Sequence, residues 1–237
     1  IGSSSASASG TVFALNELLG KPYNRTQLSN FAMKGEAVAS GSEHADNIAP
    51  ALFGGFTLVK SNQPLKILEL PTPTNLYATV IHPQIEVKTS EARAILSKKT
   101  LLKDAITQWA NVGSLVHALH TNDYNLLGES LHDVIVEPYR SLLIPHYTEI
   151  KNEAIKAGAL GAGISGSGPS IFTLCKGLET AINVKDAIKN EYSKTDRKAK
   201  GKKKCKKSEK RKRLVVNQSL RANRKNWKLE KSEICRA

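Results

Sequence analysis

The sequence contains few cysteines, and their spacing excludes the usual cysteine-based sites. The three in the 237 residues, Cys175, Cys205 and Cys235, show neither a zinc-binding nor a redox spacing. An odd number of cysteines without a pairing pattern is typical of a reducing compartment. We therefore expect a cytoplasmic protein that uses no cysteine cluster.

Long apolar runs are also missing. No segment reaches the roughly 20 consecutive apolar residues that a membrane-spanning helix needs. The chain opens with Ile1 and small polar residues rather than with a basic and then an apolar stretch, so it shows no signal peptide. The sequence predicts no membrane partner.

Acidic residues are scarce in one part of the chain only. The net charge is +14, but residues 197–237 carry 18 Lys and Arg against three acids, and residues 1–196 are close to neutral. We expect 197–237 to be a disordered tail, because this composition buries too little apolar surface. A reading-frame error, a vector-derived extension and a native basic appendage all remain open. Through this tail the chain would bind nucleic acid non-specifically, by counterion release. A dedicated nucleic-acid-binding protein is the alternative function from another class.

The apolar periodicity predicts an α+β fold with helices packed on an antiparallel sheet. Predicted strands cover 56–60, 65–70, 76–81, 159–164 and 170–174. Predicted helices cover 4–19, 27–39, 89–96, 101–119, 126–136, 147–156 and 179–192.

Two segments of small residues suggest contacts with phosphate. The first, residues 2–10, leads into a predicted helix, where free backbone N–H groups and the helix dipole favour an anion. The second is the glycine-rich run 161–170. No Gly-Lys-Ser/Thr follows the first segment, so it is not a Walker A loop. Taken alone, the first segment is more often just the start of a capped helix, and the second could be a tight hairpin turn.

Residues 35–47 bring acidic and polar side chains together. Glu36 could serve a hard cation, and Asp46 could bind an ammonium group by a charge-assisted hydrogen bond. His44 and Asn47 add an imidazole and an amide. Read alone, the cluster could equally be an Asx-type turn beside a solvated helix carboxylate.

Five segments together resemble the homoserine kinases, a family of the GHMP small-molecule kinase superfamily. They are GSSSASASG (2–10), GEAVASGSEHADNIAPALFGGF (35–56), TSEARAIL (89–96), EPYR (137–140) and GISGSGPSIF (163–172). The resemblance covers about residues 1–195. It implies a two-layer GHMP kinase-like fold, with the remainder of an N-terminal ATP-binding domain in 1–62 and a ferredoxin-like C-terminal domain in 63–196. It also implies a chain that begins inside the phosphate loop, so we expect a fragment with poor activity.

The resemblance further implies a reaction and roles for individual residues. ATP, with Mg²⁺, would phosphorylate the hydroxyl of L-homoserine to O-phospho-L-homoserine in threonine biosynthesis, in a protein expected to be a homodimer. Another acceptor of the same superfamily is the alternative. Thr89 would lie near the reacting hydroxyl or merely cap a helix. The remaining assignments are ATP for Gly2, Ser3, Ser4 and Ser5, the metal for Ser4 and Glu36, homoserine for His44, Asp46, Asn47, Arg93, Arg140 and Gly168, and catalysis for Arg93, Arg140 and Thr89.

Overall fold

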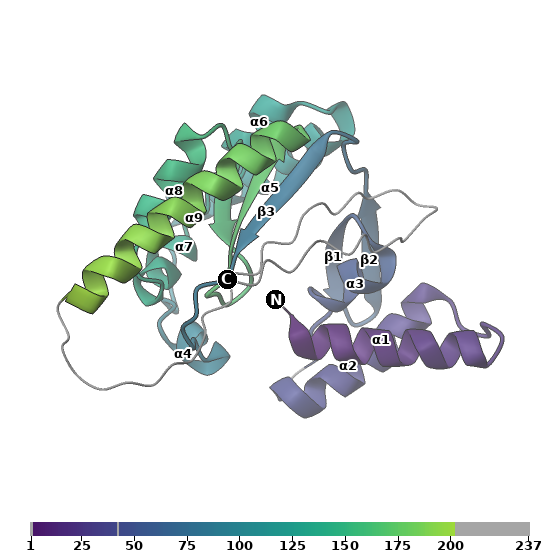
Figure 1. The fold of residues 1–237 in the computed structure, drawn as a ribbon. Coiled ribbons are helices and arrows are strands. Elements are labelled where there is room, and N and C mark those ends of the chain that lie inside the picture. The colour runs from purple at the N-terminus through teal and green to yellow at the C-terminus, as the bar shows by residue number, and fades with distance from the viewer. Residues whose placement is uncertain (1, 42, 202–237) are drawn as a thin grey trace. The chain divides into compact units, whose positions relative to one another are not determined.

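The computed structural model describes residues 2–41 and 43–201, which form two compact units (Figure 1). The first unit ends at Thr72 and the second begins at Pro73. Both combine helices with antiparallel strands, in agreement with the predicted α+β class. The expected domain boundary at 62/63 differs from this division, because it would separate two strands that pair with each other.

The first unit places three helices with one hairpin. Its elements are α1 (Ser3–Leu18), α2 (Arg25–Ser40), α3 (Ile48–Phe53), β1 (Phe56–Asn62) and β2 (Leu65–Leu70). Helix α2 begins at a capping box, in which Asn24 and Gln27 each accept the other's backbone N–H. The hydrophobic core of the first unit contains Leu28, Ala32, Met33, Ala45, Ile48 and Leu52.

Small residues let α1 and α2 approach closely. Ser5 and Ser9 of α1 are buried, and a Cβ on Gly35 of α2 would lie 3.4 Å from the Cβ of Ala8. Most of the Ser/Ala-rich segment 2–10 therefore belongs to helix α1 rather than to a loop. Of the residues expected to form the phosphate loop, Gly2 alone among those described lies outside the helix.

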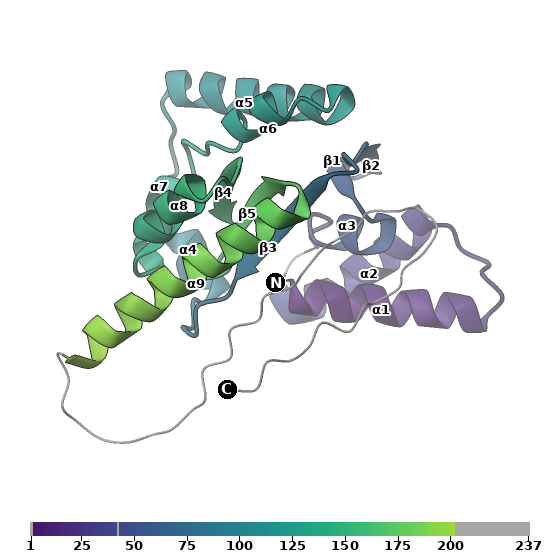
Figure 2. The same cartoon turned by 45° about the horizontal axis from the view of Figure 1, so that its top comes forward.

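The second unit is built on a three-stranded sheet in the order β3–β5–β4. The strands are β3 (Leu76–Ile81), β4 (Gly161–Ile164) and β5 (Ile171–Lys176), all antiparallel. Helices α8 (Tyr147–Lys156) and α9 (Leu178–Gly201) pack together against the sheet (Figure 2). The shared core contains Ile81, Ile150, Ile171, Cys175, Val184 and Ile188.

The connection between β3 and α8 carries the remaining elements of the second unit. They are α4 (Thr89–Ala94), α5 (Leu102–Thr121), α6 (Tyr124–Glu129), α7 (Glu137–Arg140) and the 3₁₀ turn η1 (Ser141–Leu143).

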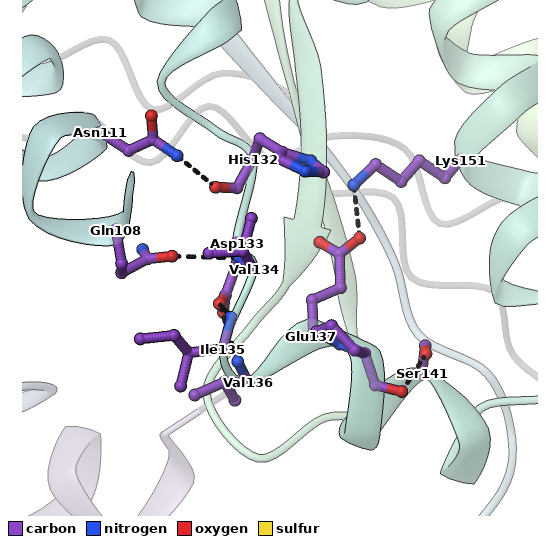
Figure 3. A network of polar contacts seen from close by, with 11 residues as sticks. Gln108, Asn111, His132, Asp133, Val134, Ile135, Val136, Glu137, Ser141 and Lys151 are labelled. Carbon is purple, nitrogen blue, oxygen red and sulfur yellow. Dashed lines mark hydrogen bonds and ion pairs between the residues drawn. The ribbon is translucent and has the colours of Figure 1, made fainter. Parts of the chain in front are cut away.

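The predicted helix at 126–136 is wrong beyond Glu129. Asp133 accepts the backbone N–H groups of Ile135 and Val136 at 2.9 and 2.8 Å, which folds the chain into a turn before α7 (Figure 3). Aspartate commonly competes with helical hydrogen bonds in this way.

Two further expectations concern the last helix and the membrane. Helix α9 continues past Asp196, so residues 197–201 of the expected disordered tail are helical, and 202–237 lie outside the described residues. Within the described ranges, no helix is both long and apolar enough to cross a membrane.

Candidate functional site

Ser4 and Glu36, the predicted metal pair, meet in the first unit. The Ser4 hydroxyl, in the first turn of α1, donates a 3.0 Å hydrogen bond to Oε1 of Glu36 near the end of α2. Glu36 is only 7% exposed. The close packing of the two helices explains how residues 32 positions apart come together. A shielded carboxylate beside a hydroxyl provides two hard oxygen ligands.

The start of α1 also lies against the predicted substrate segment. Gly2 has a left-handed φ of 52°, and a Cβ there would lie 3.2 Å from Oδ1 of Asn47. Asn47 is the N-cap residue of α3, a helix that the sequence did not predict. The structure thus places the predicted ATP-contacting and homoserine-contacting segments next to each other.

The carboxylate of Asp46 is exposed, and its Oδ1 accepts the N–H of Asn47 at 2.9 Å. This bond reaches the next residue, whereas an Asx turn reaches the residue after that, and it leaves the carboxylate at the surface. His44 is half-buried in the same segment. The arrangement presents a negative charge that a ligand's ammonium group can reach.

In the second unit, Arg140 joins two segments that are distant in sequence. Its Nη1 donates to the carbonyl of Gly166 at 2.7 Å, and its Nε donates to the carbonyl of Ala92 at 3.3 Å. Gly166 belongs to the turn between β4 and β5, and Ala92 to α4. Since a guanidinium has five N–H donors, these two bonds leave others for a ligand.

Thr89 and Arg93, the other predicted catalytic residues, both lie on α4. The N-cap of α4 is Lys88, without a side-chain cap, so the alternative that Thr89 caps this helix is wrong. The Thr89 hydroxyl instead lies 3.5 Å from that of Ser167 in the glycine turn. Arg93 is exposed in the last turn of α4.

The glycine turn needs glycine for reasons of conformation and space. Gly166 and Gly168 have φ values of 58° and 83°, and a Cβ on Gly168 would lie 3.2 Å from Cδ1 of Ile144. Left-handed φ values favour glycine. The packing of Gly168 accounts for its identity independently of any contact with homoserine.

Sequence reasoning missed His82 and Ser170, which anchor the glycine turn to β3. The His82 Nδ1 lies 2.7 Å from the Ser170 hydroxyl, and burial lowers the pKa of His82. A lowered pKa keeps this imidazole neutral at pH 7. Ser170 lies in the quoted glycine-rich run but was given no role, and for His82 the available signal was a histidine directly after a predicted strand.

The residues present fit a phosphate-bound Mg²⁺ rather than a metal enclosed by protein. Among the described residues, no group of three or more His, Cys, Asp or Glu side chains could hold a metal ion. Mg²⁺ usually binds one or two protein oxygens and completes its coordination with phosphates and water. Ser4 and Glu36 suit that arrangement.

Two family models match the chain. The model for the GHMP kinases N terminal domain matches residues 1–55, and that for GHMP kinases C terminal matches residues 115–194. The chain belongs to the GHMP kinases. Of the predicted site residues, Thr89 and Arg93 lie between the two matched regions.

The curated relatives of this GHMP kinase chain include homoserine kinases. That of Chlorobium phaeobacteroides (strain BS1) is 50% identical over 193 residues, which are 81% of this chain and 60% of the relative. That of Methanococcus maripaludis (strain S2 / LL) is 43% identical over 194 residues, covering 81% of this chain and 63% of the relative.

A solved structure gives the same result. The homoserine kinase of Cytophaga hutchinsonii has a TM-score of 0.80 and 51% identity, over 83% of this chain and 62% of that one. The chain thus spans about three-fifths of the length of these relatives.

Proposed function

We propose that this protein is an ATP-dependent homoserine kinase, which converts L-homoserine to O-phospho-L-homoserine and so serves threonine biosynthesis. The observation that carries the proposal is the 50% identity to a homoserine kinase. The contact between Ser4 and Glu36 supports it, and so do the hydrogen bonds of Arg140 to α4 and to the glycine turn, because these contacts join the five segments that carry the resemblance into two clusters.

The first unit would hold the nucleotide. Gly2, Ser3, Ser4 and Ser5 at the start of α1 offer backbone N–H groups and the positive end of a helix dipole to the phosphates. Ser4 and Glu36 would hold Mg²⁺, which supplies neutralisation of the phosphate charge. We assign residues 2–72 to the ATP-binding domain and 73–201 to the C-terminal domain.

The amino acid would be held by complementary charge. Asp46, aided by His44 and Asn47, would bind the ammonium group, and Arg93 and Arg140 would bind the carboxylate or the transferring phosphoryl group. Gly168 would let the turn approach the substrate. Thr89 would lie beside the acceptor hydroxyl. No residue of the predicted site stands out as an obligatory general base, and positioning with charge neutralisation can carry phosphoryl transfer without one.

The proposal is tested by acceptor specificity. ADP release is measured with ATP and homoserine, mevalonate or shikimate, on the 237-residue chain and on a chain extended to the length of its relatives. In the presence of ATP, we expect ADP release with homoserine but with neither mevalonate nor shikimate, and we expect this activity to depend on Mg²⁺. Preference for another acceptor would favour the alternative of a different GHMP kinase.

Location and assembly are proposed on other grounds. We place the protein in the cytoplasm because its cysteine content suits a reducing compartment. The family resemblance favours a homodimer, which the molar mass in solution tests.

A further inference from the structure

Glu137 and Lys151 form an ion pair that is shielded from solvent. Lys151 of α8 donates to Oε1 of Glu137, the first residue of α7, and the two side chains are 22% and 14% exposed (Figure 3). The pair between Lys156 and Glu153, on the same α8, has its lysine 72% exposed. Shielded charges interact more strongly, and solvent screens exposed ones.

The surroundings of Lys151 fix its position further. Its amine lies 5.9 Å from the ring centroid of Tyr147, a buried residue of the same helix. Burial, and then the charge of Glu137, raise the pKa of Tyr147, so its phenol is neutral at any pH at which the protein works. Lys151 therefore lies between a carboxylate and an aromatic face, both of which favour a cation.

Helix α7 needs a stabilising contact of this kind because it is too short to be stable without contacts to other elements. It has four residues, Glu137–Arg140, and none of them is buried. A single turn of helix is not stable without external contacts. The segment before it is held by α5, through a hydrogen bond from Asn111 to the carbonyl of His132 and one from the N–H of Val134 to Gln108 (Figure 3). Glu137 attaches the helix itself to α8.

Arg140 is the last residue of this short helix. It lies three positions after Glu137, which in a helix places both side chains on neighbouring parts of one surface. From there it donates to Ala92 of α4 and to Gly166 of the glycine turn. A rotation of α7 would break both bonds, because they depend on the direction of one planar guanidinium.

We propose that the Glu137–Lys151 ion pair is a positioning device for Arg140. It sets the orientation of α7 and thereby keeps α4, with Thr89 and Arg93, against the glycine turn. This inference rests on the proposed function, since the arrangement matters for catalysis only if these residues serve homoserine phosphorylation. Lys151 and Glu137 themselves touch no substrate in this scheme.

The test is a double-mutant cycle between Lys151 and Arg140 in the chain extended to the length of its relatives. Lys151→Met retains the apolar stem over Tyr147 and removes the charge, and Lys156→Met on the same helix is the matched control. We expect Lys151→Met to lower kcat with homoserine about tenfold and to leave the KM for ATP unchanged. In an Arg140→Met background it should lower kcat no further, because its effect passes through Arg140. Equal effects in both backgrounds, or no effect, would overturn the proposal.

Two further measurements cover other outcomes. Should Lys151→Met fail to fold, Lys151→Arg and Glu137→Gln enter the same cycle, and Lys151→Arg should retain most of kcat. Amide hydrogen exchange in α4 should rise in Lys151→Met and Glu137→Gln and stay unchanged in Lys151→Arg and Lys156→Met, whichever acceptor the enzyme uses. If the wild-type protein shows no turnover with homoserine while the variants show this exchange pattern, the proposed function alone is rejected. Unchanged α4 exchange in active protein would reject the positioning device alone.

Discussion

The two units of this protein hold their candidate functional groups by different means. In the first, Ser4 and Glu36 contact each other directly, and the packing of α1 on α2 brings them together. In the second, Arg140 donates to backbone carbonyls and holds the segments that carry Thr89 and Arg93. The first arrangement presents two side-chain oxygen atoms that a metal ion would bind. The second fixes the position of the backbone in α4 and the glycine turn. Substitutions should therefore affect metal use in one unit and geometry in the other.

The largest effect should come from breaking the first arrangement. Glu36→Gln removes the charge that a Mg²⁺ ion would meet, and we expect kcat to fall on the order of a hundredfold, because metal stabilisation of the transition state is worth several kcal/mol. The KM for homoserine should stay nearly constant. Steady-state kinetics at varied Mg²⁺ measures both, with Glu17→Gln on the exposed part of α1 as control. An unchanged Mg²⁺ dependence would remove Glu36 from the metal site.

Asp46→Asn sharpens the comparison within the first unit, since it leaves the metal pair intact. Loss of a charge-assisted hydrogen bond should cost about 1.5–3 kcal/mol, or roughly 10- to 100-fold in the KM for homoserine. The KM for ATP should change little. Equal increases in both constants would contradict the role of Asp46 in binding the ammonium group.

The framework of the second unit can be tested through its glycines. Gly168→Ala combines an unfavourable φ with a Cβ placed 3.2 Å from Ile144, and we expect a loss of about 1–3 kcal/mol in the free energy of unfolding. Gly166→Ala also adopts a positive φ, but its Cβ would meet nothing within 4 Å. It should lose less, and urea denaturation compares the two. Equal losses would show that packing against Ile144 is unimportant.

The smallest effect concerns His82 and pH. Because burial lowers its pKa in the folded state, the unfolded chain binds more protons as the pH falls through about 6.5. The stability contributed by neutral His82 is therefore present above that pH and is lost below it. The difference in unfolding free energy between wild type and His82→Gln should shrink from pH 7.5 to pH 5. A constant difference would mean that His82 does not titrate in this way.

Periodicity predicted much of the fold, and local side-chain chemistry decided the rest. Strands β2 and β3 and helix α8 have the expected bounds, because the turn sequences Asn-Gln-Pro (62–64) and Pro-Thr-Pro (71–73) delimit the strands and apolar residues keep a helical spacing through α8. Helix α3 was not predicted, because six residues are too few for a helical apolar period to show; its Pro50 lies in the first turn, where proline is tolerated. Beyond α6 the chain turns before α7 through the hydrogen bonds of one side chain, Asp133.

The candidate site shows the same division. The family resemblance identified Ser4, Glu36 and Arg140, but their roles remain predictions. Neither pattern nor resemblance indicated that Arg140 would donate to two carbonyls, or that His82 would contact Ser170. Such contacts join residues tens of positions apart, and their partners are backbone atoms or common polar side chains with no distinctive sequence signal.

The closeness of α1 and α2 has a consequence for adapting this protein. Gly35, which faces Ala8, directly precedes Glu36, so the residue that sets the spacing of the helices is the neighbour of the carboxylate. One methyl group more or less at that contact would change the gap between Ser4 and Glu36 without altering either residue. The contact between Gly35 and Ala8 therefore offers a way to change the distance between the Ser4 hydroxyl and the Glu36 carboxylate while both residues stay in place.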